Sequence, residues 1–148
     1  MSWQKILAQG FASSSELLHY LGLHDFSSKK AEQFFSTRVP LGFANRMGKN
    51  NPQDPLLLQV LALPLELENN QAFSPDPLEE LHANPIQGLL HKYHGRVLVT
   101  LTGACAINCR YCFRRHFPYQ ENNPGRENWH KITNYISEDN SIHELIFS

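Results

Sequence analysis

The sequence predicts an α/β fold in which a helical N-terminal region precedes the start of a parallel sheet. Two observations carry this prediction. Short segments with helix-capping residues and prolines fill the first half of the chain. After Gly95, a run of aliphatic residues, a loop, a helical pattern and a second apolar run follow in that order. With 148 residues, of which 41% are hydrophobic, the chain can form a packed core.

The N-terminal region, residues 1–85, is expected to contain short helices and irregular chain. The stretch "SSSELLHYLGL" offers serine N-caps, leucines on one side and Gly22 as a stop. A second helix begins at "SSKKAEQFF" and ends at Val39, because the residue before a proline is disfavoured in the helical conformation. "LGFANRM" resumes the helix briefly. Further on, "NPQDPLLLQVL" and "SPDPLEEL" predict short helical turns.

The second region, residues 86–148, predicts a strand, a loop, a helix and a strand. "RVLVTL" lacks polar alternation, which predicts a parallel strand over residues 97–101 that is buried on both faces. A helix is expected from about Arg126 to Glu138, followed by a strand in "HELIFS". Two parallel strands cannot bury both of their faces alone, so we expect the N-terminal portion of a longer protein. Helical spacing predicts core positions at Trp129, Ile132, Tyr135 and Ile136.

Composition and charge exclude some classes of protein. The N-terminus has no long uncharged apolar run and no small-residue cleavage site, which predicts a cytoplasmic protein without a membrane span. The net charge of -1 says little about partners. Its distribution says more, because five basic residues and no acidic ones lie between Leu81 and Gln120. This stretch predicts a field that attracts anions, and its plainer interpretation is a solvated basic face.

All three cysteines, Cys105, Cys109 and Cys112, lie within eight positions directly after the predicted buried strand. An odd number of clustered thiols favours metal or redox chemistry over disulfides. Three thiolates from one loop can hold three corners of a [4Fe-4S] cluster and leave the fourth iron open. S-adenosylmethionine could chelate that iron and be cleaved to a carbon radical. The alternative is a zinc site completed by His116 in a small nucleic-acid-binding module, since basic and aromatic residues are interleaved here.

The cysteine stretch resembles a known family. "CAINCRYC" is similar to the radical S-adenosylmethionine signature, with an aromatic residue, Tyr111, just before the last cysteine. The longer stretch "GLLHKYHGRVLVTLTGACAINCRYCFRRHFPY" resembles the lysine 2,3-aminomutase family. Upstream, "NPQDPLLLQVL" and "DPLEE" resemble the branch that prepares β-lysine for elongation factor P. The resemblance runs from about Arg38 to Ser148.

The resemblance implies a radical enzyme that converts L-α-lysine to β-lysine. Its cofactors would be a [4Fe-4S] cluster, S-adenosylmethionine and pyridoxal 5'-phosphate. Cys105, Cys109 and Cys112 match the cluster ligands, and Tyr111 would lie near the adenine. The implied fold is a partial (β/α)6 TIM-like radical S-adenosylmethionine barrel, of which this sequence holds the first β-α-β unit. The implied partners are lysine and a reductant such as flavodoxin or ferredoxin, with no nucleic acid and no membrane.

The resemblance also implies roles in the substrate pocket. Arg114 matches the arginine that holds the lysine carboxylate, for which a planar bidentate guanidinium is suited. Lys92, Tyr93 and Arg96 match the stretch that lies against pyridoxal phosphate, with Arg96 as a phosphate contact. The plainer interpretations are packing for Tyr93 and a strand edge for Arg96. Arg115 and His116 are expected at the surface or behind the site.

Two elements of the family, a "GGDP" segment and the lysine that binds pyridoxal phosphate, are not in these 148 residues. We therefore do not expect this chain to turn over by itself. A radical S-adenosylmethionine enzyme without pyridoxal phosphate and the zinc module remain as alternatives.

Overall fold

The computed structural model describes residues 2–69 and 71–148, except the side chain of Arg126. The chain forms two compact units, which are described one by one. The first unit joins the chain up to Ala72 with Cys105–Arg115, and the second joins Phe73–Ala104 with His116–Ser148. The cysteine loop is therefore part of the same unit as the N-terminal helices. The boundary predicted between residues 85 and 86 stays a prediction.

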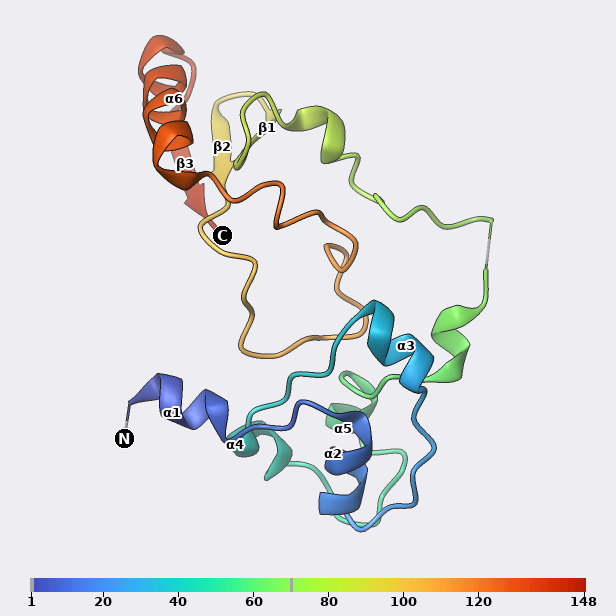
Figure 1. The fold of residues 1–148 in the computed structure, drawn as a ribbon. Coiled ribbons are helices and arrows are strands. Elements are labelled where there is room, and N and C mark those ends of the chain that lie inside the picture. Colours follow the sequence, from blue (N-terminus) through green and yellow to red (C-terminus); the bar gives the residue numbers. More distant parts are fainter. Residues whose placement is uncertain (1, 70) are drawn as a thin grey trace. The chain divides into compact units, whose positions relative to one another are not determined.

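Short helices make up the first unit, as the sequence predicts (Figure 1). The segment "SSSELLHYLGL" forms α2, and Gly22 follows it with a φ of 77°. The second predicted helix ends at Phe34, five residues before Val39, because the backbone of Val39 pairs with that of Phe11 instead. The elements are α1 (Trp3–Ala8), α2 (Ser14–Tyr20), α3 (Lys29–Phe34), α4 (Leu41–Ala44), α5 (Pro55–Leu58) and the 3₁₀ helix η1 (Pro64–Leu67).

An apolar core holds the first unit together. Asp54 caps α5 by accepting hydrogen bonds from the backbone N–H groups of Leu56 and Leu57 at 2.9 and 3.0 Å. This cap fixes the start of the helix that places Leu57 in the core. Ile107, from the cysteine loop, also packs against this core. The buried members are Leu17, Leu18, Leu21, Val39, Ala44, Met47, Leu57, Val60 and Leu61.

The second unit holds a small mixed sheet in the order β1-β2-β3. Its elements are η2 (Leu81–Ala83), β1 (Leu89–Tyr93), β2 (Arg96–Val99), α6 (Gly125–Glu138) and β3 (Glu144–Phe147). β2 and β3 are parallel, with α6 between them in the chain, which confirms the predicted strand, helix and strand (Figure 1). β1 was not predicted, and it pairs with β2 in antiparallel fashion. In "SPDPLEEL", where a short helical turn is predicted, the chain forms a turn at residues 77–78, and the 3₁₀ helix η2 begins at Leu81.

The core of the second unit lies between the sheet and α6. Val97 and Val99 are each 1% exposed and pack with Ile132 of α6, whereas Leu98, on the other face of β2, is only half-buried. The structure thus buries one face of β2 fully, where the sequence predicts two, because α6 covers only the face of the two valines. The four positions predicted as core in α6 all pack against this cluster: Trp129, Ile132, Tyr135 and Ile136.

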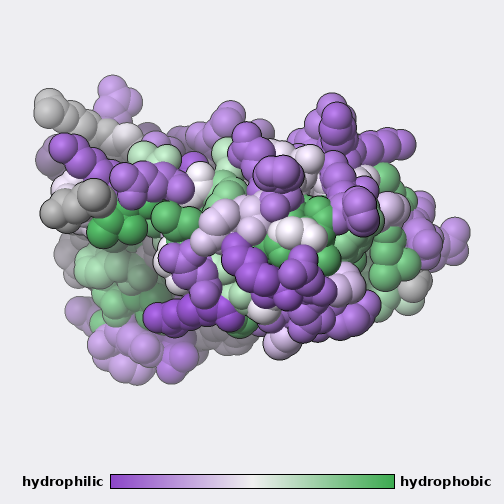
Figure 2. Space-filling model, turned by 90° about the horizontal axis from the view of Figure 1, so that it is seen from below, coloured by the Kyte–Doolittle hydropathy of each residue, from purple (hydrophilic) through white to green (hydrophobic). Residues whose placement is uncertain are grey.

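Large apolar side chains remain at the surface of the second unit. Leu145 and Phe147 of β3 are 42% and 60% exposed. Figure 2 draws one face of the molecule, on which green hydrophobic residues appear between purple hydrophilic ones.

Within the described part of the chain, no helix has both the length and the apolar character that crossing a membrane requires.

Candidate functional site

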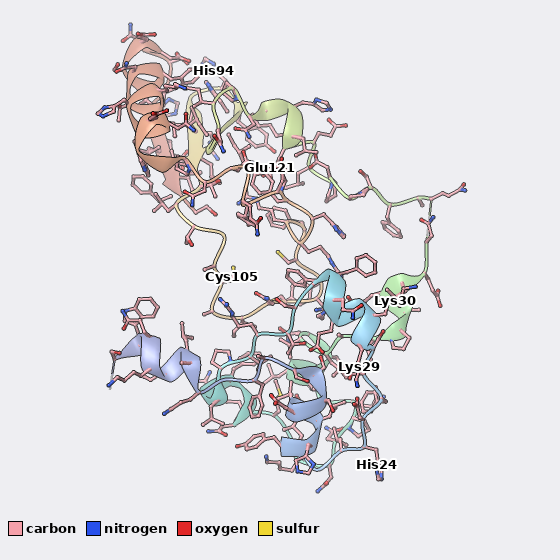
Figure 3. All side chains as sticks on the ribbon, viewed as in Figure 1. His24, Lys29, Lys30, His94, Cys105 and Glu121 are labelled. Carbon is pink, nitrogen blue, oxygen red and sulfur yellow. The ribbon has the colours of Figure 1, made fainter. Side chains whose placement is uncertain are left out.

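The cysteine loop of the first unit carries three free thiols. Cys105 is exposed, and Cys109 and Cys112 are half-buried (Figure 3 labels Cys105). The N–H of Cys112 donates to the carbonyl of Cys109 at 3.0 Å, which folds the loop into a turn. Among residues 2–69 and 71–148, no three His, Cys, Asp or Glu side chains gather in an arrangement that could hold a metal ion. As a donor set, however, three unpaired thiols from one loop suit an iron-sulfur cluster.

Backbone hydrogen bonds attach this loop to the N-terminal helical region. The N–H of Asn108 donates to the carbonyl of Arg38 at 3.0 Å, and the N–H of Arg110 donates to the carbonyl of Gln59 at 2.8 Å. In return, Nη1 of Arg38 donates to the carbonyl of Cys105 at 3.1 Å. The Asn108 amide donates to the carbonyl of Ser36 at 2.9 Å. The loop is therefore connected to the segment before α4 and to the end of α5.

A buried ion pair lies at the centre of this attachment. Arg110, between Cys109 and Tyr111, has a side chain that is 6% exposed, and that of its partner Glu66 is 15% exposed. Nη2 of Arg110 lies 2.6 Å from Oε2 of Glu66, and Nε lies 2.9 Å from Oε1. Arg115 reaches the same Oε2 with its Nη2 at 2.8 Å. Two arginines of the loop thus share one carboxylate from η1.

The shared carboxylate is held in its charged form. Burial by itself raises the pKa of Glu66, but hydrogen bonds from Arg110, from the N–H of Leu63 and from Arg115 outweigh it, so the pKa lies below its usual value. Sequence reasoning missed this role of Glu66, and it placed Arg115 at the surface or behind the site. The sequence holds only a weak indication of this ion pair, because Glu66 lies 44 residues before Arg110.

Tyr111, predicted near the adenine, extends from the loop and is 70% exposed. Its hydroxyl donates to Oε1 of Gln59 at 3.1 Å. The pKa of Tyr111 is raised, first by the negative charge of the Cys109 thiolate and then by desolvation. The phenol is therefore neutral and can act as a hydrogen-bond donor beside the second cysteine.

Arg114, predicted to hold the substrate carboxylate, is half-buried two residues after Cys112. The central carbon of its guanidinium lies 5.2 Å from the centre of the Phe113 ring, a distance typical of a cation-π contact. This contact lies within the same loop as the cysteines.

The predicted pyridoxal phosphate contacts lie in the second unit. Tyr93 ends β1 and is 60% exposed, with Nζ of Lys92 at 5.6 Å from its ring centre. Lys92 also donates to the carbonyl of Leu78. Nη2 of Arg96 lies 3.0 Å from Oε2 of Glu144 in an exposed ion pair, an arrangement consistent with its plainer interpretation as a strand-edge residue. His91 contacts the hydroxyl of Tyr135 through Nδ1 at 2.8 Å.

The predicted anion-attracting stretch is thus partly neutralised. Although it contains no acidic residue itself, Arg96 pairs with Glu144, and Arg110 and Arg115 pair with Glu66. Both carboxylates lie outside the stretch in the sequence.

The second unit also contains an open cavity of about 370 Å³ at the carboxyl end of β2. The carboxyl ends of parallel strands are where α/β folds place their ligands. Its lining residues follow β2 or precede α6: Thr100, Leu101, Thr102, Gly103, Tyr119, Gln120 and Asn123.

Comparison with known proteins identifies relatives over nearly the whole chain, although no family model matches. An L-lysine 2,3-aminomutase of Haemophilus influenzae is 46% identical over 99% of this chain and 44% of its own length. An L-lysine 2,3-aminomutase of Escherichia coli K12 is 45% identical with the same coverage. That of Methanococcus maripaludis is 35% identical over 99% of this chain and 35% of its own length. The chain therefore spans less than half the length of these relatives and corresponds to an N-terminal portion of them.

Proposed function

This chain belongs to the L-lysine 2,3-aminomutase family, and we propose that the protein is an isomerase that converts L-α-lysine to β-lysine. The observation that carries the proposal is the identity of 45–46% that extends over 99% of the chain. The three free thiols of one loop support it, since they supply the donor type that the chemistry requires.

We propose that Cys105, Cys109 and Cys112 hold a [4Fe-4S] cluster. When bound, such a cluster with one open iron would chelate S-adenosylmethionine and supply the electron that cleaves it to a carbon radical. All three thiols are unpaired, so no disulfide has to be reduced first. Tyr111, whose phenol stays neutral, is proposed to contact the adenine from its place beside Cys109.

Arg114 is the proposed ligand of the lysine carboxylate. Its guanidinium can donate two parallel hydrogen bonds to a carboxylate, which sets the orientation of the substrate as well as its affinity. The ring of Phe113 supports the guanidinium from one side.

Tyr93 and Arg96 are the proposed contacts of pyridoxal 5'-phosphate, whose conjugated ring would stabilise the substrate radical. Arg96 pairs with Glu144, and their side chains are 52% and 43% exposed. Exposed ion pairs contribute only about 0 to 1 kcal/mol, so Arg96 can exchange this carboxylate for a phosphate at little cost. Its pairing does not exclude the proposed role.

The parent fold we propose is a partial (β/α)6 barrel in which β2, α6 and β3 form the first β-α-β unit. Parallel pairing of β2 with β3 across α6 supports this arrangement. The cysteine loop follows the carboxyl end of β2, where barrels of this kind place their reacting groups. Elongation factor P is the proposed destination of the product, and a flavodoxin or ferredoxin is the proposed reductant, both on the resemblance of the sequence.

Anaerobic reconstitution of the intact protein tests this proposal. We expect iron and sulfide in near-equal amounts, and an electron paramagnetic resonance signal of the reduced cluster that changes when S-adenosylmethionine is added. β-Lysine should then form from L-α-lysine only with pyridoxal phosphate present. Stoichiometric zinc without iron would refute the proposal in favour of the zinc module. Cleavage of S-adenosylmethionine with no β-lysine and no effect of pyridoxal phosphate would indicate another radical enzyme.

Arg114→Lys gives a sharper test of the substrate pocket. Lysine keeps the charge but loses the bidentate geometry, so we expect KM for lysine to rise by roughly tenfold or more. His116→Ala, outside the proposed pocket, is the matched control and should leave KM unchanged. Equal KM values for the wild type and Arg114→Lys would remove Arg114 from the pocket.

A further inference from the structure

We propose that Arg110 and Glu66 are positioning residues for the iron-sulfur cluster: their largely buried ion pair fixes the cysteine loop on the N-terminal helices and so holds Cys109 and Cys112 in place. This inference rests on the proposed function. It assigns to the N-terminal region the task of supporting the cluster loop, and it starts from contacts within the first unit only.

The first argument is that the buried Arg110 side chain is fully hydrogen-bonded. Arg110 is 7% exposed, and each nitrogen of its guanidinium has a hydrogen-bond partner. Nε and Nη2 donate to Glu66, Nη1 donates to the carbonyl of Phe35, and Nη2 also donates to the carbonyl of Ala31 at 3.1 Å. Lysine has no planar fork and could not reproduce these contacts together. The groups that surround residue 110 therefore require an arginine at this position of the loop.

The second argument is the place of these contacts on α3. Ala31 lies within the helix and Phe35 caps its end, so Arg110 donates to carbonyls of the last turn and the cap. Carbonyls at a helix C-terminus attract a positive charge, and the carbonyl of Ala31 accepts from Arg110 in addition to the N–H of Phe35 at 3.1 Å. The guanidinium also lies 5.1 Å from the Phe35 ring centre. Arg110 thus fixes the cysteine loop to the end of a secondary-structure element rather than to flexible chain.

The third argument is that the Glu66 carboxylate pairs with an arginine at each end of the segment 110–115. Arg115 donates to Oε2 of Glu66 at 2.8 Å and to the carbonyl of Arg110 at 3.0 Å. Residues 110 and 115 are thereby held together around Glu66, and Cys112 lies in the short segment between them. Cys109 directly precedes it. Two of the three proposed cluster ligands therefore lie in or next to a segment whose ends are both fixed.

The test compares the intact wild-type protein with Glu66→Gln, which keeps the size of the side chain and removes its charge. Glu144→Gln is the matched control, because it neutralises a carboxylate that pairs with an arginine of the second unit, Arg96. Two readouts are measured on folded protein, as checked by circular dichroism. One is the alkylation rate of Cys109 by iodoacetamide in the metal-free protein. The other is the spectroscopic signal of the reconstituted cluster with and without S-adenosylmethionine.

We expect Cys109 of Glu66→Gln to be alkylated roughly tenfold faster or more, because losing a buried charge-assisted hydrogen bond favours opening of the loop. Its cluster should have lower occupancy and a broadened signal with a weaker response to S-adenosylmethionine. A simple loss of stability would not alter the signal of the folded fraction. Glu66→Asp should recover part of the wild-type signal, and Glu144→Gln should match the wild type.

Arg115→Gln provides a milder second variant if Glu66→Gln does not fold. It removes one of the two arginines and should shift both readouts in the same direction by a smaller amount. Wild-type alkylation rates and cluster signals in the variants would overturn the inference while leaving the proposed function intact. A wild-type protein that takes up no iron would instead overturn the proposed function, and this inference with it.

Discussion

Replacing Arg110 with alanine should release the cysteine loop from the first unit. The change removes the guanidinium and leaves the backbone of the loop unaltered. It also removes the donors that serve Glu66 and the carbonyls of Phe35 and Ala31. The loop would keep its backbone hydrogen bond from residue 110 to Gln59 and the packing of Ile107.

The size of the effect follows from these contacts. Breaking a buried ion pair by removing one partner costs about 3 to 5 kcal/mol. Glu66 would retain Arg115 and the N–H of Leu63, so its charge would not be left alone. The cost should therefore lie at the lower end, at about 3 kcal/mol for local opening of the loop. A difference of that size changes the population of the open loop roughly a hundredfold.

Amide hydrogen exchange of the intact protein measures this opening directly. The N–H groups of Asn108 and Arg110 donate to backbone carbonyls, so they are protected only while the loop is docked. We expect peptides that cover them to exchange roughly a hundredfold faster in Arg110→Ala. Arg96→Ala, which removes an exposed arginine from an ion pair of similar length, should have no effect on these peptides. An increase of less than about threefold in Arg110→Ala would refute the reasoning.

Three further predictions concern the cluster, a turn and pH. Cys109→Ala should retain less than half of the wild-type iron after anaerobic reconstitution, since two thiols hold a cluster poorly; wild-type iron content would contradict this role. Gly95→Ala should lower the free energy of unfolding by about 1 to 3 kcal/mol in urea, because Gly95 has a φ of 77° and an added Cβ would lie 2.2 Å from the His143 ring. Gly42→Ala, which meets no atom within 4 Å, is its control, and equal losses in the two variants would count against the argument. Finally, the pKa of Glu66 is lowered in the folded protein, so its contribution is fully present above the ordinary value of 4.5 and is lost as the pH falls through the folded value. The difference in urea stability between wild type and Glu66→Gln should therefore shrink below pH 4.5, and a constant difference from pH 7 to pH 3 would disprove it.

The local elements of the fold could be predicted from the sequence because they depend on neighbouring residues. Serine caps and Gly22 predicted α2, and the spacing of Trp129 and Ile132 predicted both α6 and the face that it buries. β1 was missed because "LLHKY" places polar residues in the second half of the strand, where the pattern no longer indicates burial. The β1 strand forms through its antiparallel pairing with β2, which a local pattern does not reveal.

The roles of individual charges could be predicted less well. Arg96 and Arg115 looked like members of one basic stretch, yet each has a carboxylate partner from elsewhere in the chain. Whether two charged side chains pair depends on how the chain folds. Glu66 and Arg110 are 44 residues apart, and no helix or strand periodicity relates positions at that separation. The roles assigned to the cysteines and to Arg114 stay predictions.

By itself, the sequence determined most of the elements and their order, the positions of the thiols and the similarity to L-lysine 2,3-aminomutases. These properties depend on capping, on periodicity and on short spacing, which act between near neighbours. Only the tertiary structure decided that the cysteine loop belongs with the N-terminal helices and that one carboxylate holds two of its arginines, Arg110 and Arg115. A buried charge must find its partner in space, and distance along the chain does not limit which partner it finds.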